Sequence, residues 1–171
     1  TVFHETPEFP GGGRVTRGES VTFPNLYPFA RWHTVTVITH EHLPATFSQS
    51  QVTDAVLAAT DLLSDREGYA SLNWNYLPSA GASLIHPHLQ ALCDDRPSFV
   101  QGVYLSGAKE YYRRNGRRYA DCIKQWEQSS PRYLFGEEVF WFTQPVPLGE
   151  REIRAILPVS HPSEFGPYAE V

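Results

Sequence analysis

The chain of 171 residues is long enough to bury a sizeable core, and its 41% hydrophobic and 13% aromatic content is typical of a globular fold. A formal net charge of -5 offers no basic footprint for nucleic acid or an anionic membrane surface, so a small ligand is the expected partner. No apolar run approaches the roughly 18 to 20 residues that span a bilayer, and the N-terminal stretch lacks the apolar core of a signal peptide. We therefore expect a soluble, cytoplasmic protein.

The first half of the chain predicts strands around one helix. Residues 1–13 contain two prolines and a Gly-Gly-Gly run without periodicity, which predicts an irregular arm. Alternation and β-branched residues predict strands over 14–23 and 34–39, joined by a proline-bounded turn that contains Asn25. A capping box begins at Ser48, and the apolar residues after it recur at helical spacing. Two further strands are predicted at 71–75 and 84–92.

This order of elements predicts an α+β domain over residues 14–98, with an antiparallel sheet and packed helices. Residues 99–130 predict a helical connector that is interrupted at Gly116. Strand character then returns, and the run 154–161 echoes 35–42 as a β-rich segment that closes on a histidine. We interpret residues 131–171 as the start of a second, similar repeat.

The segment that carries most of the chemistry combines a small-residue loop with three polar residues at alternating positions. Because successive side chains of a strand point to opposite faces, we expect His86, His88 and Gln90 to share one face. The preceding loop contains Gly81 and Ser83, which allow backbone amides and a hydroxyl group to approach a phosphate closely.

A histidine that attacks phosphorus needs a neutral imidazole with one N–H held by an acceptor and the other nitrogen free. His88 meets this need if a backbone carbonyl accepts its N–H. The amide of Gln90 can donate a hydrogen bond to a nonbridging phosphoryl oxygen without supplying a proton to a leaving group. This arrangement favours transfer to a second phosphate over hydrolysis.

Two histidines at positions i and i+2 of a strand also occur in metal sites, so the pair alone fits metal binding as well as nucleophilic catalysis. The small-residue loop and Gln90 favour catalysis. Four other histidines have no identifiable partner and are interpreted as surface or core-edge side chains: His4, His33, His40 and His161.

Asn75, the run Ala-Gly-Ala-Ser and the run His-Pro-His-Leu-Gln together resemble the active-site signature of the galactose-1-phosphate uridylyltransferases, a branch of the histidine-triad superfamily. The resemblance implies a histidine-triad-like antiparallel sheet, with His88 as the nucleophile and His86 and Gln90 as further catalytic residues. The nucleotide-binding residues that it implies are Asn25, Asn75, Gly81, Ser83 and Gln90.

The resemblance also implies a zinc site with His42 and His86 as ligands, because the matching residues bind zinc in some members of the family. The cysteine pair that completes this site in those members is missing here. Pairing of two copies of the chain into a homodimer is a further implication.

We therefore predict a nucleotidyltransferase of galactose metabolism that moves a nucleoside monophosphate between a nucleotide sugar and a sugar 1-phosphate, or phosphate, through a covalent intermediate on His88. No nucleic acid or membrane is expected as a partner. The alternatives are a dinucleoside polyphosphate or nucleotide-sugar phosphorylase, a non-catalytic nucleotide-binding module, and a metal-dependent enzyme with His42, His86 and His88 as ligands.

Overall fold

The computed structural model describes residues 4–169, which form two compact units. Unit 1 comprises residues 4–96 and 160–169, and unit 2 comprises residues 97–159. The first three residues of the predicted arm and the last two of the predicted second repeat lie outside the described residues. None of the described helices is long and apolar enough to cross a membrane.

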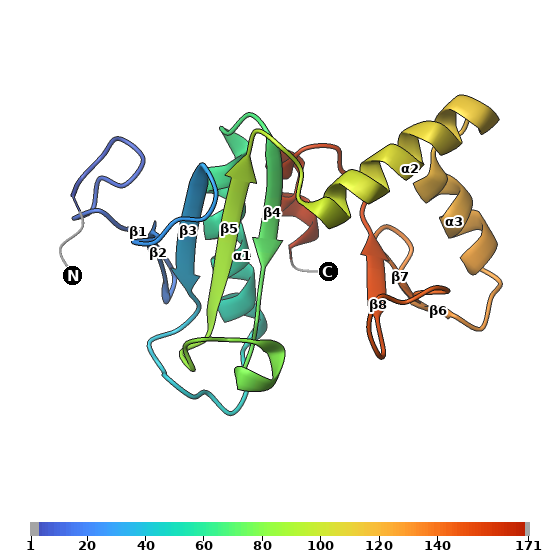
Figure 1. Ribbon diagram of the computed structural model, residues 1–171. Coiled ribbons are helices and arrows are strands. Elements are labelled where there is room, and N and C mark those ends of the chain that lie inside the picture. Colours follow the sequence, from blue (N-terminus) through green and yellow to red (C-terminus); the bar gives the residue numbers. More distant parts are fainter. Residues whose placement is uncertain (1–3, 170–171) are drawn as a thin grey trace. The chain divides into compact units, whose positions relative to one another are not determined.

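Unit 1 is built on a five-stranded antiparallel sheet in the order β1-β2-β3-β5-β4, with helix α1 packed on one face (Figure 1). The predicted α+β fold with an antiparallel sheet is confirmed. The elements of unit 1 are β1 Val15–Arg17, β2 Ser20–Pro24, β3 Trp32–Val37, α1 Gln49–Ser64, β4 Tyr69–Asn73, η1 Pro78–Ala80, β5 His88–Asp94, η2 Pro162–Glu164 and η3 Gly166–Tyr168.

Helix α1 begins where the sequence predicts it. The Ser48 side chain accepts the backbone N–H of Gln51, and the Gln51 side chain accepts the backbone N–H of Ser48, which completes a capping box. The apolar residues of the helix and of β5 form the core of unit 1: Ala55, Ala59, Leu63, Leu89, Ala91 and Cys93. The helix is therefore held to the sheet by burial of its small and apolar face.

The strand predicted over residues 14–23 is wrong as a single strand, because the chain reverses within it. Gly18 and Glu19 form a two-residue connection between β1 and β2, whose ends pair at Arg17 and Ser20. Gly18 has a φ of 54°, and a Cβ atom there would lie 2.1 Å from a carboxylate oxygen of Asp54. Only glycine fits this hairpin without strain.

Unit 2 contains two helices and a three-stranded antiparallel sheet in the order β6-β7-β8. Its core joins Ile123 to Phe140 and Phe142, and Gly116, in the left-handed region with a φ of 65°, ends the first helix. The elements are α2 Phe99–Asn115, α3 Tyr119–Glu127, β6 Tyr133–Phe135, β7 Phe140–Thr143 and β8 Ile153–Ile156. The interpretation of residues 131–171 as a partial repeat stays a prediction.

Candidate active site

Strand β5 presents His88 and Gln90 on the sheet face opposite α1. The residues that alternate with them, Leu89 and Ala91, are buried against α1, so His88 and Gln90 point away from that helix. The register pairs Val37 of β3 with His88, and Val35 with Gln90. His88, the predicted nucleophile, and Gln90, the predicted amide donor, therefore share one face of the sheet and lie beside Val37 and Val35 of β3.

His88 is held in the tautomer that a nucleophile requires. Its ring Nδ1 lies 2.8 Å from the backbone carbonyl oxygen of His86. A carbonyl can only accept, so Nδ1 carries the proton and donates it, and the neutral ring keeps its lone pair on Nε2. The side chain is 8% exposed, which limits the orientations of the ring. Nε2 is the atom of His88 that is available to attack an electrophile.

His86 does not lie on the strand, contrary to the prediction of a strand over 84–92. The ladder begins at His88 because Pro87 has no N–H to donate, although its carbonyl still accepts the N–H of Ile38 at 3.2 Å. His86 is instead held in the preceding loop, where its Nε2 donates to the backbone carbonyl of Thr39 at 2.8 Å. The side chain of His86 thus anchors its own backbone, whose carbonyl accepts the hydrogen bond from His88.

The anchor of His86 is itself tied to the start of α1. The hydroxyl group of buried Thr39 donates to Glu19 at 2.6 Å, and the side-chain amide of Gln51 donates to the same carboxylate oxygen at 3.2 Å. These two hydrogen bonds, that from Thr39 first, lower the pKa of Glu19 and keep it ionised. A hairpin, a helix terminus and a strand end thus fix the loop that carries His86.

Gln90 has a partner that sequence reasoning missed. The Oε1 atom of Gln90 lies 2.9 Å from Nε2 of His33, and the side-chain nitrogen of Asn25 lies 3.0 Å from the same ring atom. His33 is 4% exposed, and burial lowers its pKa, an effect partly offset by the hydrogen bond with Gln90. The structure therefore joins Asn25 and Gln90, both predicted site residues, through an imidazole to which the sequence analysis assigned no partner.

The remaining predicted nucleotide contacts lie on the loop between β4 and β5. Asn75, Gly81 and Ser83 are all exposed in this loop, which contains the short helix η1. Gly81 has a φ of 81°, and its N–H donates to the carbonyl of Pro78 at 3.0 Å. The loop leads directly into His86, so its exposed groups precede the two histidines in the chain.

The predicted zinc ligands lie together but are only two. The rings of His42 and His86 meet edge to face, with centroids 4.5 Å apart. Within residues 4–169 no group of three or more histidine, cysteine or acidic side chains could hold a metal ion. Both cysteines, Cys93 and Cys122, are buried elsewhere. The described residues do not supply the four ligands of a structural zinc site.

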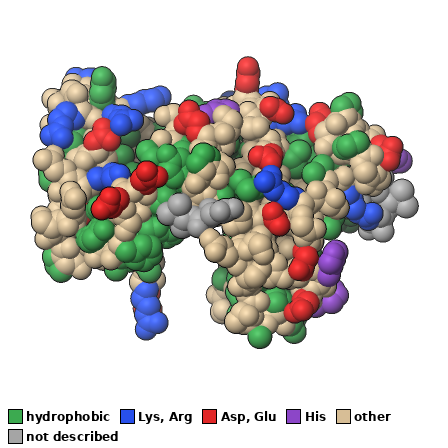
Figure 2. All heavy atoms as spheres, turned by 180° about the vertical axis from the view of Figure 1, so that it is seen from behind, with side chains coloured by type: hydrophobic (Ala, Val, Ile, Leu, Met, Phe, Trp, Pro, Cys, Tyr) green, Lys and Arg blue, Asp and Glu red, His purple; other side chains and the backbone are tan. Residues whose placement is uncertain are grey.

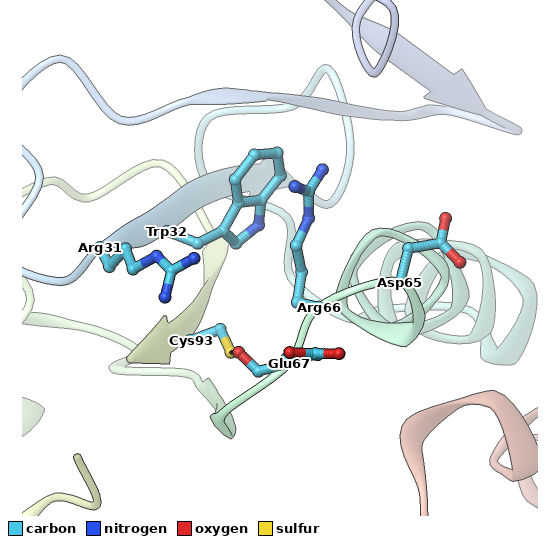
Figure 3. A pocket seen from close by; sticks show the side chains of 6 residues that line it. All are labelled: Arg31, Trp32, Asp65, Arg66, Glu67 and Cys93. Carbon is cyan, nitrogen blue, oxygen red and sulfur yellow. Dashed lines mark hydrogen bonds between the residues drawn. The ribbon is translucent and has the colours of Figure 1, made fainter. Parts of the chain in front are cut away.

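A cavity of about 330 Å³ lies on the other side of the sheet, near the end of α1 (Figure 3). Trp32 lines it and precedes His33 on β3, so the two side chains point to opposite faces. Arg66 stacks on the Trp32 ring at 3.6 Å and pairs with Glu8, while Arg31 pairs with Asp95. Arg31 and Arg66 thus each have an acidic partner, and none of the predicted site residues lines the cavity.

Charged side chains of both signs are interspersed on the face that Figure 2 shows. In unit 2, Arg113 and Arg114 pair with Glu110, and Arg118 pairs with Asp121. Much of the basic run that the sequence contains after residue 112 is therefore neutralised locally.

No family model matches the chain. An uncharacterised protein of Archaeoglobus fulgidus is 28% identical over 133 residues, which cover 75% of this chain and 40% of that protein. A solved uridylyltransferase mutant superposes with a TM-score of 0.61 and 20% identity, over 81% of this chain and 53% of that chain. The chain has the fold of the uridylyltransferases.

Two more structures share the uridylyltransferase fold. A galt-like protein of Arabidopsis thaliana has a TM-score of 0.59 and 17% identity, over 82% of this chain and 55% of that chain. An ADP-glucose phosphorylase of Arabidopsis thaliana, with bound ADP-glucose, has a TM-score of 0.59 and 16% identity, over 75% of this chain and 50% of that chain. The chain thus spans about half the length of these structures, and the predicted resemblance is confirmed for the fold.

Proposed function

We propose that the chain provides the nucleophilic half-site of a nucleotidyltransferase that transfers a nucleoside monophosphate through His88. The observation that supports this most directly is the hydrogen bond from Nδ1 of His88 to the carbonyl of His86, because it leaves the lone pair on Nε2. Solved structures with this fold include a uridylyltransferase and an ADP-glucose phosphorylase with bound ADP-glucose, which supports a nucleotide sugar as donor.

The proposed reaction has two displacements. Nε2 of His88 attacks the α-phosphorus of the nucleotide sugar, a P–N bond forms, and the P–O bond to the sugar 1-phosphate breaks, so the leaving phosphate keeps the electron pair. An oxygen of the acceptor, a second sugar 1-phosphate or inorganic phosphate, then attacks phosphorus, and the P–N electron pair returns to Nε2. The carbonyl of His86 holds the Nδ1 proton throughout and favours the positively charged ring of the intermediate.

Gln90 and the exposed loop have supporting roles in this proposal. An amide N–H of Gln90 donates to a nonbridging oxygen of the α-phosphate and supplies no proton to water, which favours transfer over hydrolysis. Gly81, Ser83 and Asn75 bind the phosphates and nucleoside from the loop between β4 and β5, and Asn25 contacts the nucleoside. Galactose as the sugar and a cytoplasmic location stay predictions.

The intact mass of the protein after incubation with a panel of nucleotide sugars and dinucleotides tests the reaction. We expect a gain of one nucleoside monophosphate with a single preferred donor, and its removal by sugar 1-phosphate or by inorganic phosphate. The acceptor that removes it separates a transferase from a phosphorylase. His88→Asn should give no gain, while the same change at exposed His40 should leave the adduct intact.

The result that would overturn this function is equally specific. If no donor adds mass to the wild type, and if His88→Asn binds the same nucleotides with unchanged affinity, the chain is a nucleotide-binding module without catalysis. Binding is measured by calorimetry on both proteins.

Zinc at His42 and His86 and the homodimer stay predictions, and native mass spectrometry tests both together. The resemblance predicts a dimer with bound zinc that is lost in His42→Ala, because the rings of His42 and His86 lie together. A protein that carries no zinc would remove the zinc prediction. A monomer at micromolar concentration would remove the dimer prediction.

A further inference from the structure

Two side-chain amides meet one nitrogen of the His33 ring. Nε2 of His33 lies 2.9 Å from Oε1 of Gln90 and 3.0 Å from Nδ2 of Asn25. A neutral ring nitrogen either donates through its proton or accepts through its lone pair, so Nε2 cannot serve both neighbours. The protonation of this ring therefore decides which way each amide is turned.

One arrangement gives each of the three groups a partner, and it uses the longer of the two contacts between Asn25 and His33. The backbone N–H of Tyr27 donates to Oδ1 of Asn25 at 2.9 Å, which turns the NH₂ group of Asn25 toward His33. That NH₂ group also lies within 3.4 Å of Nδ1 of His33, which can accept it. Nε2 then carries the proton and donates to Oε1 of Gln90. Both nitrogens of His33 are used, one as donor and one as acceptor.

This arrangement leaves the NH₂ group of Gln90 free of His33, on the face that also carries His88. A reversed amide would present the oxygen of Gln90 to an incoming phosphate and repel it. In this arrangement the hydrogen bond from His33 selects the donating orientation of Gln90 before a ligand arrives.

We propose that His33 is a positioning residue, which fixes the amide of Gln90 as a donor to the reacting phosphoryl group and ties it to Asn25. The proposal rests on the proposed nucleotidyl transfer at His88. His33 links two elements of the site, because Asn25 directly follows β2 and Gln90 lies on β5.

The surroundings of His33 suit this role. The ring is buried, and Phe29 packs against it edge to face with centroids 4.3 Å apart. Its other contacts, Asn25 and Gln90, are uncharged. Burial lowers the pKa of His33, so the ring is neutral at pH 7 and can donate and accept at once. A charged ring would donate from both nitrogens and lose the contact from Asn25.

A double-mutant cycle separates positioning from general support. Removal of one preorganised donor typically lowers kcat by ~10²–10³-fold, which is the expected effect of Gln90→Leu on the nucleotidylation of His88. We expect His33→Leu to lower the same rate constant by ~10–10²-fold, less than loss of the donor itself, with little change in KM, and His33→Gln to recover part of the rate. The double variant should be no slower than Gln90→Leu alone, because His33 acts through Gln90.

Thr34→Val is the matched control. Thr34 is the next residue of β3, is equally buried, points to the α1 face, and has a hydroxyl group with no hydrogen-bond partner among the described residues. The Thr34→Val variant should transfer the nucleoside monophosphate at the wild-type rate. If His33→Leu and Gln90→Leu multiply in the double variant, or if His33→Leu has the wild-type rate, the positioning role is overturned.

A spectroscopic measurement decides the inference even if the wild type shows no transfer. In ¹⁵N-labelled protein at pH 7, Nε2 of His33 should carry a slowly exchanging proton, and the side-chain amide resonances of Gln90 should shift in His33→Leu but not in Thr34→Val. A ring protonated only on Nδ1, or unchanged Gln90 resonances, would refute the positioning. Absence of a nucleotide adduct on the wild type would refute the proposed reaction alone.

Discussion

Leu77 holds a backbone conformation that L-amino acids rarely adopt. It has a φ of 68° and a ψ of 158°, and among the described residues of unit 1 it is the only non-glycine residue with a positive φ. Such a conformation costs about 1–3 kcal/mol and persists only where the surrounding structure enforces it. Leu77 precedes η1 in the loop that carries Asn75 and Gly81, so this strain is stored beside the candidate nucleotide contacts.

Leu77→Gly should therefore be more stable than Leu77→Ala, which keeps the strained conformation. Glycine adopts this conformation freely, and the relief of strain exceeds the added entropy of the unfolded chain, for a difference of about 1 kcal/mol in the free energy of unfolding. Leu77 is 39% exposed, and both variants lose most of the apolar burial of its side chain, so their difference reports the strain. Urea unfolding measures the difference. The control pair Leu84→Gly and Leu84→Ala, in the same loop without positive φ, should show no advantage for glycine, and a Leu77→Gly variant less stable than Leu77→Ala would contradict the strain.

At the same scale, the sequence predicts the shared strand face of His88 and Gln90 but not the contact of His33 with Gln90. Alternation along one strand is local, so the shared face of His88 and Gln90 follows from spacing alone. The contact between His33 and Gln90 depends on the register of β3 with β5, which joins residues 57 positions apart. No local pattern encodes that register, although strand alternation places His33 on one face with Val35 and Val37.

At the scale of elements, the pattern predicts regular structure and misses interruptions. The capping box located α1, and Gly116 marked the end of α2, because both signals are local chemistry. The hairpin at Gly18 was missed because β-branched residues continue on both sides of the turn. The pattern predicts the start of β5 too early, because Pro87 fits the alternation of a strand but has no N–H to donate.

The element connections explain why the site is well ordered on one side. Glu19 from the β1–β2 hairpin and Gln51 from α1 both bond near Thr39, whose carbonyl holds His86. The β4–β5 loop instead exposes Asn75, Gly81 and Ser83 to solvent. The proposed nucleophile, His88, is therefore held by backbone and side-chain hydrogen bonds, while the candidate nucleotide contacts lie on an exposed loop.

At the scale of the whole molecule, the chain spans about half the length of the solved structures that share its fold. The His88 face, its positioning contacts and its anchoring loop all belong to unit 1. The sequence predicted this α+β domain because its strands and helix are strongly patterned. It did not predict that residues 160–169 belong to unit 1, because their contact with α1 is between residues far apart in the chain. The hydroxyl group of Thr53 on α1 donates to the carbonyl of Ala169, 116 positions away.

The stability of the whole molecule should fall on acidification, because several carboxyl groups have lowered pKa values in the folded state: Glu8, Glu19, Glu110, Glu127 and Glu152. Glu127 is the most buried of them, and Arg132 lowers its pKa through hydrogen bonds of 2.8 and 3.0 Å.

The unfolded chain, with ordinary pKa values near 4.5, takes up protons first as the pH falls. The stabilisation is thus fully present above about pH 5 and is lost as the pH drops through the lowered folded values. Urea unfolding from pH 7 to pH 3 should show this decline.

Glu127→Gln should be less stable than the wild type at pH 7, and its free energy of unfolding should decline less steeply below pH 5, because the variant lacks the group that titrates. Glu110→Gln removes an exposed ion pair, so its free energy of unfolding at pH 7 should be close to that of the wild type. Equal acid limbs for the wild type and Glu127→Gln would show that the Glu127–Arg132 pair does not set the acid stability of the molecule.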